Sequence, residues 1–490
     1  MTSIRLKAGS RMLFMELNND ICYQAVLTHD RRFDGVFFVG VKSTHIYCRT
    51  VCTAKPPAAR SCTFHTSAAA AELAGFRPCL RCRPELAPGL ARVDSIGRLA
   101  SAISRRIEDG ALSEMSIGEL AAELDISERH LRRVVSSEFG VSPLELAQTQ
   151  RLLLAKQLLT DSTLPVTEIA FASGFNSVRR FNAIFKSSYG LNPTQIRKGS
   201  QSQAETEAIE CELGYRPPYD WQALFTFLSA RAVAGVESFN DGRYRRAVRI
   251  GENKGWLEVI PHPQIHRVRV RMAPSLSRAI LPTLTKVRRQ FDLNADPLAI
   301  SAHLGELSKK NPGLRVPGAF DGFEMAVRAI LGQQVSVKGA TTLMSRLVTA
   351  YGEPCETPFE DVGWLFPRAA KLASIDIDEL CKTVKMPHTR GVAINALAQA
   401  VASGHVNLDH AGDLELTLEK LKGLPGIGEW TAQYIAMRAL NWPDAFPHSD
   451  LGIYKAMKER NPKLVLAAAE VWRPWRAYAA IHLWKSLETV

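Results

Sequence analysis

The chain has 490 residues and a formal net charge of +12, with 46% hydrophobic and 22% charged residues. This length is too great for one hydrophobic core and predicts about three or four domains. The charged N-terminal stretch MTSIRLKAGSRMLFMEL lacks the apolar segment of a signal peptide, and no apolar run approaches the length of a membrane span. We therefore expect a cytoplasmic protein without membrane contact, whose thiols stay reduced and whose positive charge favours a polyanionic partner.

Two close cysteine pairs stand out in residues 21–90. Cys48 and Cys52 form C-x3-C in IYCRTVC, and Cys79 and Cys82 form C-x2-C in FRPCLRCRP. In a reducing compartment, two such pairs are typical of a tetrahedral zinc site, with Zn–S bonds of about 2.3 Å, rather than of disulfides. The spacing alone favours a structural zinc ion that staples a small domain.

A reactive role for these cysteines is a second interpretation. Four thiolates around one Zn²⁺ carry more negative charge than the metal offsets, so their sulfur is electron-rich and nucleophilic. The neighbouring side chains Arg49, Arg77, Arg81 and Arg83 are expected to attract a phosphate backbone to such a site.

Residues 95–198 carry a helical pattern that occurs twice. The segments LAAELDISERHLRRVVSSEFGVSP (120–143) and IAFASGFNSVRRFNAIFKSSYGLNP (169–193) share apolar positions and a glycine near the end. Each predicts a short helix, a turn, a capping residue and a second helix, which is the helix-turn-helix layout. The second helices are predicted to begin at Ser127 and Asn176. They would present Glu128, Arg129, Arg132 and Arg133 in the first copy, and Ser177, Val178, Arg179 and Arg180 in the second.

Two such helices on one domain can enter successive segments of the DNA major groove. The alternative is a tight helical bundle whose arginines are merely exposed. The doubling of the motif favours DNA binding.

The segment KGSQSQAETEAIE (198–210) is small and polar and is predicted to be a linker. Beyond it, HRVRVRM (266–272) alternates strictly, which predicts a strand with Val268, Val270 and Met272 on its buried face. WLEVI (256–260) is its predicted neighbour. The arginines of the other face are expected in solvent rather than on DNA.

The stretch LKGLPGIGEWTAQY (421–434) places three glycines between two predicted helices. Gly423, Gly426 and Gly428 permit positive φ and close backbone approach, and the free N–H groups of the following helix can bind a phosphate. Asp450 follows Gly428 after twenty-two residues. Taken locally, Asp450 is a helix cap on LGIYKAMKER, but that role does not explain the hairpin.

The first block resembles the zinc-bearing N-terminal domain of the adaptive-response (Ada-type) alkylation-repair regulators, through FDGVFFVGVKSTHIYCRTVC and FHTSAAAAELAGFRPCLRCRP. The resemblance implies that Cys48 accepts a methyl group irreversibly from a DNA methylphosphotriester. It further implies that Cys48, Cys52, Cys79 and Cys82 bind one Zn²⁺. Relatives usually carry proline where this chain has Thr50, and often glycine where it has His45.

The second block is similar to the paired helix-turn-helix domain of AraC-type transcription activators, most clearly in the second copy. This resemblance implies promoter DNA and RNA polymerase as partners.

Residues 212–490 resemble the AlkA-type 3-methyladenine DNA glycosylases of the helix-hairpin-helix superfamily, including a TATA-binding-protein-like sheet. The resemblance rests on YRPPYDWQALFTFLSARAV, PGAFDGFEMAVRAILGQQVSV, the hairpin and WRPWRAYAAIHLW. It implies that Asp450 is the catalytic carboxylate and that the hairpin binds DNA with a monovalent cation at its turn. Trp430 occupies the place of the lysine that strand-cutting relatives use, which implies a monofunctional enzyme. The implied base-binding residues are Trp430, Tyr434, Trp484 and Phe227, with Gln334 where relatives insert a leucine into the DNA stack.

For Phe227, a place in the hydrophobic core and a role in binding the base are predicted with equal weight. Electron-rich rings suit alkylated purines of the 3-methyladenine or 7-methylguanine type, because such bases are cationic or electron-poor.

We therefore predict a multidomain α+β protein, expected to be a monomer on double-stranded DNA. Its segments are a tail (1–20), a small zinc-bound α/β domain (21–90), an all-α double helix-turn-helix domain (95–198), a linker (199–211), a TATA-binding-protein-like sheet subdomain (212–298) and an all-α helix-hairpin-helix glycosylase domain (299–490). Two alternatives remain open. One is a transcriptional activator whose glycosylase half only binds DNA, and the other is a repair enzyme whose zinc domain only targets DNA.

Overall fold

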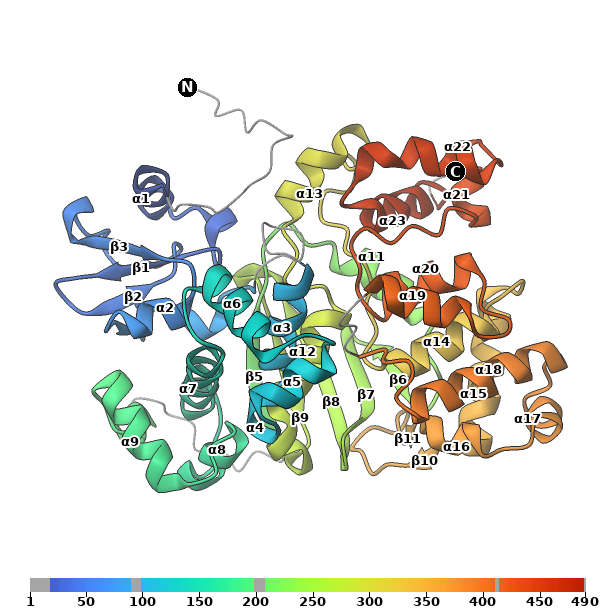
Figure 1. Cartoon of the computed structure of the whole chain (residues 1–490), viewed down its shortest axis with the longest axis horizontal. Helices are drawn as coiled ribbons and strands as arrows, with labels where there is room; N and C mark the ends of the chain where they lie inside the picture. The colour runs from blue at the N-terminus through green and yellow to red at the C-terminus, as the bar shows by residue number, and fades with distance from the viewer. Residues whose placement is uncertain (1–17, 90–97, 198–207, 410–413, 489–490) are drawn as a thin grey trace.

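The structure is a computed structural model of the chain and describes residues 18–89, 98–197, 208–409 and 414–488. In Figure 1 the N-terminal sheet domain lies at one end, the helix-turn-helix region lies beside it, a second sheet occupies the centre, and the C-terminal helices form the other end. No helix in these ranges is long and apolar enough to cross a membrane.

The N-terminal domain is a four-stranded sheet with a helix on each face. Its elements are α1 (Asn19–Leu27), β1 (Phe38–Val41), β2 (Ile46–Cys48), β3 (Cys62–His65), α2 (Ala68–Leu73) and β4 (Arg77–Pro78), and the strand order is β3-β1-β2-β4. Alternation along β1 directs Val39 to the side of α1, where it packs with Cys22 and Val26. Phe38 points to the opposite face and packs with Tyr47 and Ala71. The domain therefore has two small cores around one thin sheet.

The helical region contains the predicted repeat. Its helices are α3 (Arg98–Glu108), α4 (Ala111–Glu114), α5 (Ile117–Glu123), α6 (Glu128–Phe139), α7 (Pro143–Asp161), α8 (Val166–Ala172), α9 (Val178–Tyr189) and α10 (Pro193–Arg197). Ser142 starts α7 with a capping box to Glu145. Most apolar positions of the two copies are buried, with Leu131 and Phe139 in the first core and Phe181 and Tyr189 in the second. The long helix α7 joins the two copies.

The central sheet is antiparallel, with strand order β5-β9-β8-β7-β6. Its elements are β5 (Ile209–Gly214), α11 (Trp221–Ser229), β6 (Glu237–Asn240), β7 (Arg243–Ile250), β8 (Asn253–His262), β9 (Arg267–Met272) and α12 (Ile280–Gln290). The predicted strand is confirmed, because Val268, Val270 and Met272 are fully buried. Its arginines pair across the strands with glutamates of β5, as in Arg267–Glu212 at 2.7 Å.

The C-terminal region is mostly helical and encloses one large core. Its helices are α13 (Pro297–Leu304), α14 (Gly322–Leu331), α15 (Val337–Tyr351), α16 (Ala369–Ala373), α17 (Ile377–Val384), α18 (His388–Ala402), α19 (Leu414–Lys422), α20 (Glu429–Arg438), α21 (Leu451–Met457), α22 (Pro462–Ala468) and α23 (Arg476–Ser486). Two-residue strands β10 (Glu353–Pro354) and β11 (Trp364–Leu365) form a small antiparallel pair. The predicted mixed α and β architecture is confirmed.

The N-terminal domain packs directly against the helix-turn-helix region through buried charged groups. Lys156 on α7 forms an ion pair with Glu85 at 2.6 Å, and both side chains are 2% exposed. Arg83 pairs with Asp161 at the end of the same helix, at 2.7 Å. Since a buried charge is costly unless it is paired, these contacts fix the position of the sheet domain on α7.

Candidate functional site

The fold brings the four predicted zinc ligands together through one parallel strand pair. β2 and β4 run parallel with Tyr47 opposite Pro78, and the Cys79 N–H donates to the Tyr47 carbonyl at 3.0 Å. Cys48 at the end of β2 and Cys79 just after β4 therefore meet at the same edge of the sheet. Cys52 and Cys82 reach the same point from the turns that follow each strand.

The cluster geometry fits a tetrahedral metal ion. The four Sγ atoms lie within 4.8 Å of one another, whereas ideal Zn–S bonds would place sulfur atoms about 3.8 Å apart. Three of the thiols are buried, and Cys48 is the partly exposed member. Hydrogen bonds from the neighbouring thiols lower the pKa of Cys79 far below its ordinary value, and those around Cys82 raise its pKa. A bound cation is what would allow all four to be thiolates together.

The expected role of the flanking arginines is wrong for two of the four. The Arg49 guanidinium is buried, pairs with Asp34 and donates to the Cys82 carbonyl at 3.1 Å. The Arg83 guanidinium already forms ion pairs with Glu85 and Asp161. The carboxylates that neutralise these arginines come from outside the cysteine motifs, so the motifs gave no sign of them. Arg81 is exposed and Arg77 is half-buried.

Two residues that depart from the family pattern have clear structural places. His45 ends the turn between β1 and β2 with φ +50, a left-handed conformation that glycine adopts without strain. Thr50 is 1% exposed, and its hydroxyl donates to the Asp30 carbonyl at 3.2 Å. A side-chain hydrogen bond therefore ties the segment just after Cys48 to the backbone at Asp30.

A buried carboxylate links the Cys48 strand to the connecting helix α7 and to the second helix-turn-helix copy. Glu72 on α2 accepts hydrogen bonds from the Tyr47 hydroxyl at 3.0 Å, the Thr149 hydroxyl at 2.9 Å and the Tyr189 hydroxyl at 3.3 Å. Thr149 lies on α7, and Tyr189 ends α9. Burial raises the pKa of Glu72 to about 7, although the three hydroxyls oppose the shift. Nothing in the sequence pattern indicated this contact.

The predicted recognition helices present their basic residues to solvent. Ser127 caps α6 as expected, and Arg129 and Arg133 are exposed on it. Glu128 and Arg132, also exposed, form an ion pair at 2.6 Å. The start predicted for the second helix, at Asn176, is one residue early.

Ser177 is the cap of α9, since its hydroxyl accepts from the Arg180 N–H at 3.4 Å. Ser177 is therefore a capping residue rather than the first turn of the helix. Arg179 and Arg180 are exposed after it, and Val178 is half-buried.

The glycine-rich turn lies between α19 and α20, as predicted. Gly423, Gly426 and Gly428 are all exposed. Gly426 has φ +76, and a Cβ there would lie 2.8 Å from the Ala393 Cβ, so the turn needs glycine at this position. Gly428 occupies the N-cap of α20, where it contributes no side chain to the first N–H groups. The start of α20 is therefore open to an anion.

A glutamine that the sequence reasoning missed connects this turn to the expected DNA-inserting residue. The Gln333 side chain donates to the Gly426 carbonyl and to the Thr431 hydroxyl, both at 2.9 Å. Its neighbour Gln334 is exposed with φ +54 at the tip of the loop between α14 and α15. The only sequence signal for Gln333 was its position beside Gln334.

Asp450 is both a helix cap and the centre of an indole clamp. Its Oδ1 accepts from the Gly452 N–H at 2.8 Å and the Ile453 N–H at 3.1 Å, which caps α21. The same atom accepts from the Trp484 indole at 2.9 Å, and Oδ2 accepts from the Trp430 indole at 3.0 Å. The carboxylate remains half-buried. Four donors thus hold the carboxylate in one orientation.

Three of the four predicted base-binding aromatics gather around this carboxylate. Trp430 and Tyr434 stack on successive turns of α20, with centroids 5.2 Å apart and an interplanar angle of 7°. Trp484 on α23 lies 6.3 Å from Tyr434 and 6.5 Å from Phe227. Residues from α11, α20, α21 and α23 therefore form one cluster, although up to 257 positions separate them in the chain.

Phe227 differs from the other three, because guanidinium groups lie over its ring. Arg231 lies 3.7 Å and Arg438 5.0 Å from its centroid. Burial would raise the pKa of the Tyr434 phenol, but the charges of Arg438, Arg231 and Arg328 outweigh it and lower that pKa.

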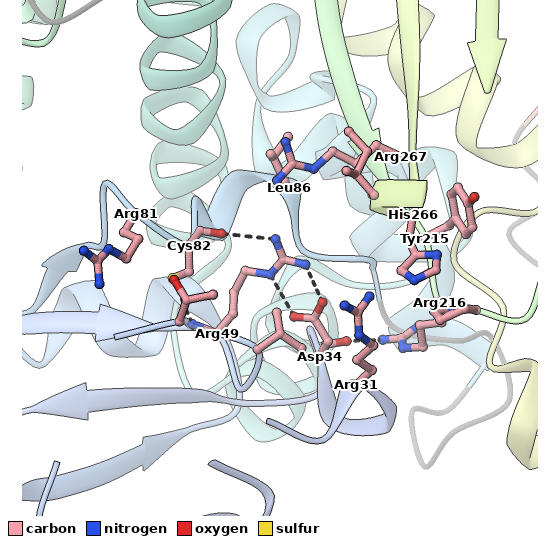
Figure 2. A pocket seen from close by; sticks show the side chains of 15 residues that line it. Arg31, Asp34, Arg49, Arg81, Cys82, Leu86, Tyr215, Arg216, His266 and Arg267 are labelled. Atoms are coloured by element: carbon pink, nitrogen blue, oxygen red, sulfur yellow. Dashed lines mark hydrogen bonds and ion pairs between the residues drawn. The ribbon is translucent and has the colours of Figure 1, made fainter. Parts of the chain in front are cut away.

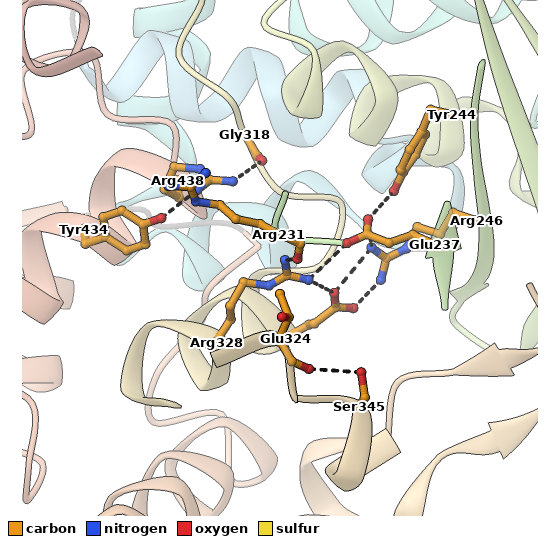
Figure 3. A network of polar contacts seen from close by, with 11 residues as sticks. Arg231, Glu237, Tyr244, Arg246, Gly318, Glu324, Arg328, Ser345, Tyr434 and Arg438 are labelled. Carbon is orange, nitrogen blue, oxygen red and sulfur yellow. Dashed lines mark hydrogen bonds and ion pairs between the residues drawn. The ribbon is translucent and has the colours of Figure 1, made fainter. Parts of the chain in front are cut away.

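Figure 3 shows how these arginines continue into a buried network with Glu237 and Glu324. Arg328 donates to Glu237 at 3.0 Å and to Glu324 at 3.2 Å. Arg246 on β7 contacts both carboxylates. The network supports the aromatic cluster from the side of the central sheet.

Four known domain families match successive segments of the chain, in the same order as the four regions of the fold. The metal binding domain of Ada matches residues 21–85, and a helix-turn-helix domain matches 120–199. The AlkA N-terminal domain matches 210–321, and the HhH-GPD superfamily base excision DNA repair protein matches 327–462.

Individual relatives cover the whole chain or one half of it. The chain is 38% identical over 482 residues to the "Probable bifunctional transcriptional activator/DNA repair enzyme AlkA" of Mycobacterium tuberculosis, covering 95% of this chain and 96% of the relative. It is 38% identical to "DNA-3-methyladenine glycosylase 2" of Escherichia coli, over 56% of this chain and 95% of the relative. It is 30% identical to "Bifunctional transcriptional activator/DNA repair enzyme Ada" of Escherichia coli, over 40% of this chain and 54% of the relative.

The cysteine cluster, the doubled helix-turn-helix and the helix-hairpin-helix domain together define a DNA-repair protein joined to a transcription regulator. The chain belongs to the bifunctional transcriptional activator/DNA repair family, in which an Ada-type metal-binding and helix-turn-helix half precedes an AlkA-type glycosylase half.

Proposed function

We propose that the C-terminal half hydrolyses the N-glycosidic bond of alkylated purines in DNA, of the 3-methyladenine and 7-methylguanine type. The observation that carries this proposal is the Asp450 carboxylate, held by the indoles of Trp430 and Trp484 beside the aromatic cluster. Tyr434 belongs to the same cluster, and a base extruded from the duplex would stack there.

The proposed reaction breaks the bond between the sugar C1′ and the base nitrogen, and the electron pair leaves with the base. Positive charge then develops on the deoxyribose, and the Asp450 carboxylate stabilises it. A water molecule adds to C1′, and its proton passes to the carboxylate or to solvent. Trp430 has no amine to attack C1′, so the enzyme releases the base without cutting the strand.

The glycine turn and Gln334 would serve the same reaction by binding DNA. Exposed Gly423, Gly426 and Gly428 would let a phosphate approach the start of α20, with a monovalent cation at the turn. Gln334 at its exposed loop tip would enter the stack that the extruded base leaves. Phe227 would support the pocket through its arginine contacts rather than stack on the base.

For the N-terminal half, we propose that Cys48 takes a methyl group from a DNA methylphosphotriester. The Cys48 thiolate attacks the methyl carbon, a C–S bond forms, the C–O bond breaks, and the phosphodiester leaves with the electron pair. Cys48 is the partly exposed member of the cluster, which favours it as the acceptor. Zn²⁺, held by Cys48, Cys52, Cys79 and Cys82, would keep the sulfurs deprotonated. The product thioether is neutral, so repulsion of DNA phosphates falls and DNA affinity rises.

The remaining proposals concern organisation and partners. We assign the zinc, helix-turn-helix, sheet and glycosylase functions to residues 21–90, 95–198, 209–298 and 299–490, with the sheet beginning at β5, three residues before its predicted start at 212. The helix-turn-helix pair would bind promoter DNA through Arg129, Arg132, Arg133, Arg179 and Arg180 and would recruit RNA polymerase. The protein would act in the cytoplasm as a monomer on double-stranded DNA.

Incubation with methylated duplex DNA tests the glycosylase proposal. Free methylpurine should appear without strand breaks until alkali is added, and borohydride should trap no enzyme–DNA adduct. Binding without base release would instead support the alternative, an activator whose glycosylase half only grips DNA.

A further inference from the structure

A basic cavity lies at the junction between the N-terminal domain and the central sheet. Its volume is about 190 Å³, and Arg31, Arg81 and Cys82 line it from one domain while Arg216 and Arg267 line it from the other. Figure 2 shows these side chains lining the cavity between the N-terminal domain and the central sheet. The cavity lies beside the cysteine cluster, with which it shares Cys82, but neither Cys48 nor Asp450 lines it.

The charges around this cavity are strongly unbalanced. Five arginines and one histidine line it, against a single lining carboxylate, Asp34, and Arg267 is paired at 2.7 Å with Glu212 outside the lining. Asp34 is already engaged by Arg49 in a buried ion pair. The pKa of the His266 imidazole is lowered, mainly by burial and also by the positive charge of Arg31. The cavity therefore has an excess of positive charge that an anion would relieve.

Arg216 fixes the two walls of the cavity relative to each other. Its guanidinium is 3% exposed and donates across the junction to the carbonyl of Asp34 at 2.8 Å. It also donates to the carbonyls of Gly89 at 3.0 Å and Asn294 at 2.8 Å. These bonds connect the zinc domain, the segment that follows it and the end of the sheet subdomain.

Close backbone packing shows that the junction is preformed. A Cβ at Gly214, on β5, would lie 2.2 Å from the Leu86 carbonyl of the N-terminal domain. The two domains thus meet without room for a side chain at this point. A concave site that is already formed can bind a ligand without the free-energy cost of a conformational change.

We propose that this cavity binds a phosphate group, which holds the zinc domain against the central sheet. Guanidinium groups form paired hydrogen bonds to phosphate oxygens, and Arg31 and Arg81 are exposed at the rim from the zinc-domain side. Arg267 and His266 face them from β9 and the turn before it. The phosphate can come from the DNA backbone or from a free phosphate ion, because both present the same oxygens.

The test compares two doubly substituted full-length proteins. The first is Arg31→Ser with Arg81→Ser, which removes the exposed rim. The second is Arg60→Ser with Arg269→Ser, which removes the same charge from arginines that do not line the cavity. Zinc content is measured for both, because Arg81 lies between two cysteines of the metal cluster.

Binding is followed by histidine NMR of His266 and by the midpoint of thermal unfolding. One arm uses inorganic phosphate and the other a short undamaged duplex. In the unsubstituted and control proteins, we expect the ligand to raise the pKa of His266 and the unfolding midpoint. In the rim variant, we expect affinity at least about tenfold lower.

A response to phosphate alone assigns the site to a free anion, and a response to duplex alone assigns it to the DNA backbone. Equal responses in the rim and control variants, or no response of His266 to either ligand, would overturn the proposal.

Discussion

The cysteine cluster and the Asp450 site hold their acidic groups in opposite ways. The four sulfurs come from two short turns that one strand pair brings together. The carboxylate is held by groups from three helices, namely the N–H groups of α21, Trp430 of α20 and Trp484 of α23. The first site would need a bound metal ion for all four sulfurs to be thiolates, whereas the second is held by the packing of a whole domain.

This difference implies that the two sites fail independently. Loss of the metal should affect the small cores of the zinc domain, which has few buried residues of its own. Among the described residues, the large core beneath Asp450 holds no cluster of metal-ligating side chains. Each substitution below changes one half of the protein, and the other half serves as the internal reference.

The largest effect is expected from removing a zinc ligand. Cys52→Ser should abolish stoichiometric zinc binding and unfold the zinc domain, because structural zinc sites supply about 10–16 kcal/mol of apparent binding free energy. Zinc content and proteolysis of residues 18–89 check this result. Cys62→Ser, at a half-buried cysteine outside the cluster, should keep the metal. Loss of base release in Cys52→Ser would show that the two halves are not independent.

The next largest effect is expected at the carboxylate. Asp450→Asn should lower base release by at least about 10²- to 10³-fold, since the anion beside the sugar is lost, while DNA binding persists. Single-turnover release of methylpurine measures the change.

Asp376→Asn is the matched control, because Asp376 caps α17 with two N–H contacts at 3.0 Å but contacts no indole in the described structure. Normal release rates in Asp450→Asn would contradict the assignment of Asp450 as the catalytic carboxylate.

A smaller effect is expected at the buried carboxylate that joins the zinc domain to α7 and α9. Because burial raises the folded-state pKa of Glu72 to about 7, its folded form binds a proton that the unfolded form releases near pH 4.5. Stability should therefore fall as pH rises from about 4.5 to 7. Glu72→Gln should remove this slope and add roughly 3 kcal/mol at pH 8.

Thermal unfolding between pH 4.5 and 8 measures the Glu72 effect. The control is Glu168→Gln, at an exposed glutamate of α8, which should leave the slope in place. An unchanged slope in Glu72→Gln would mean that another group carries it.

The smallest effect is expected at single recognition arginines. Arg179→Ala and Arg180→Ala should each weaken specific promoter binding by about 1–3 kcal/mol, as loss of a base contact does. Mobility shifts on promoter and random duplexes measure the difference. Base release should not change, and equal loss on both duplexes would point to phosphate rather than base contacts.

The sequence indicated the zinc cluster well because all four ligands lie within 35 residues of chain and metal spacing is local. Asp450 and the hairpin were likewise predicted from a motif and a resemblance. The buried ion pairs of Arg49 and Arg83 could not be predicted, because their partners Asp34 and Asp161 lie on other elements of the fold. Glu72 and Gln333 were missed for the same reason, because their partners come from segments that only the tertiary fold brings together.

One labelling experiment tests the central claim that a single chain carries two independent chemistries. Duplex DNA carrying labelled methyl groups on both purines and phosphates is incubated with the unsubstituted protein, Cys48→Ala and Asp450→Asn. Free base and protein-bound methyl are then scored separately. The unsubstituted protein should give both, Cys48→Ala only free base, and Asp450→Asn only protein-bound methyl. Protein-bound methyl that survives in Cys48→Ala, or one substitution that abolishes both products, would contradict the claim.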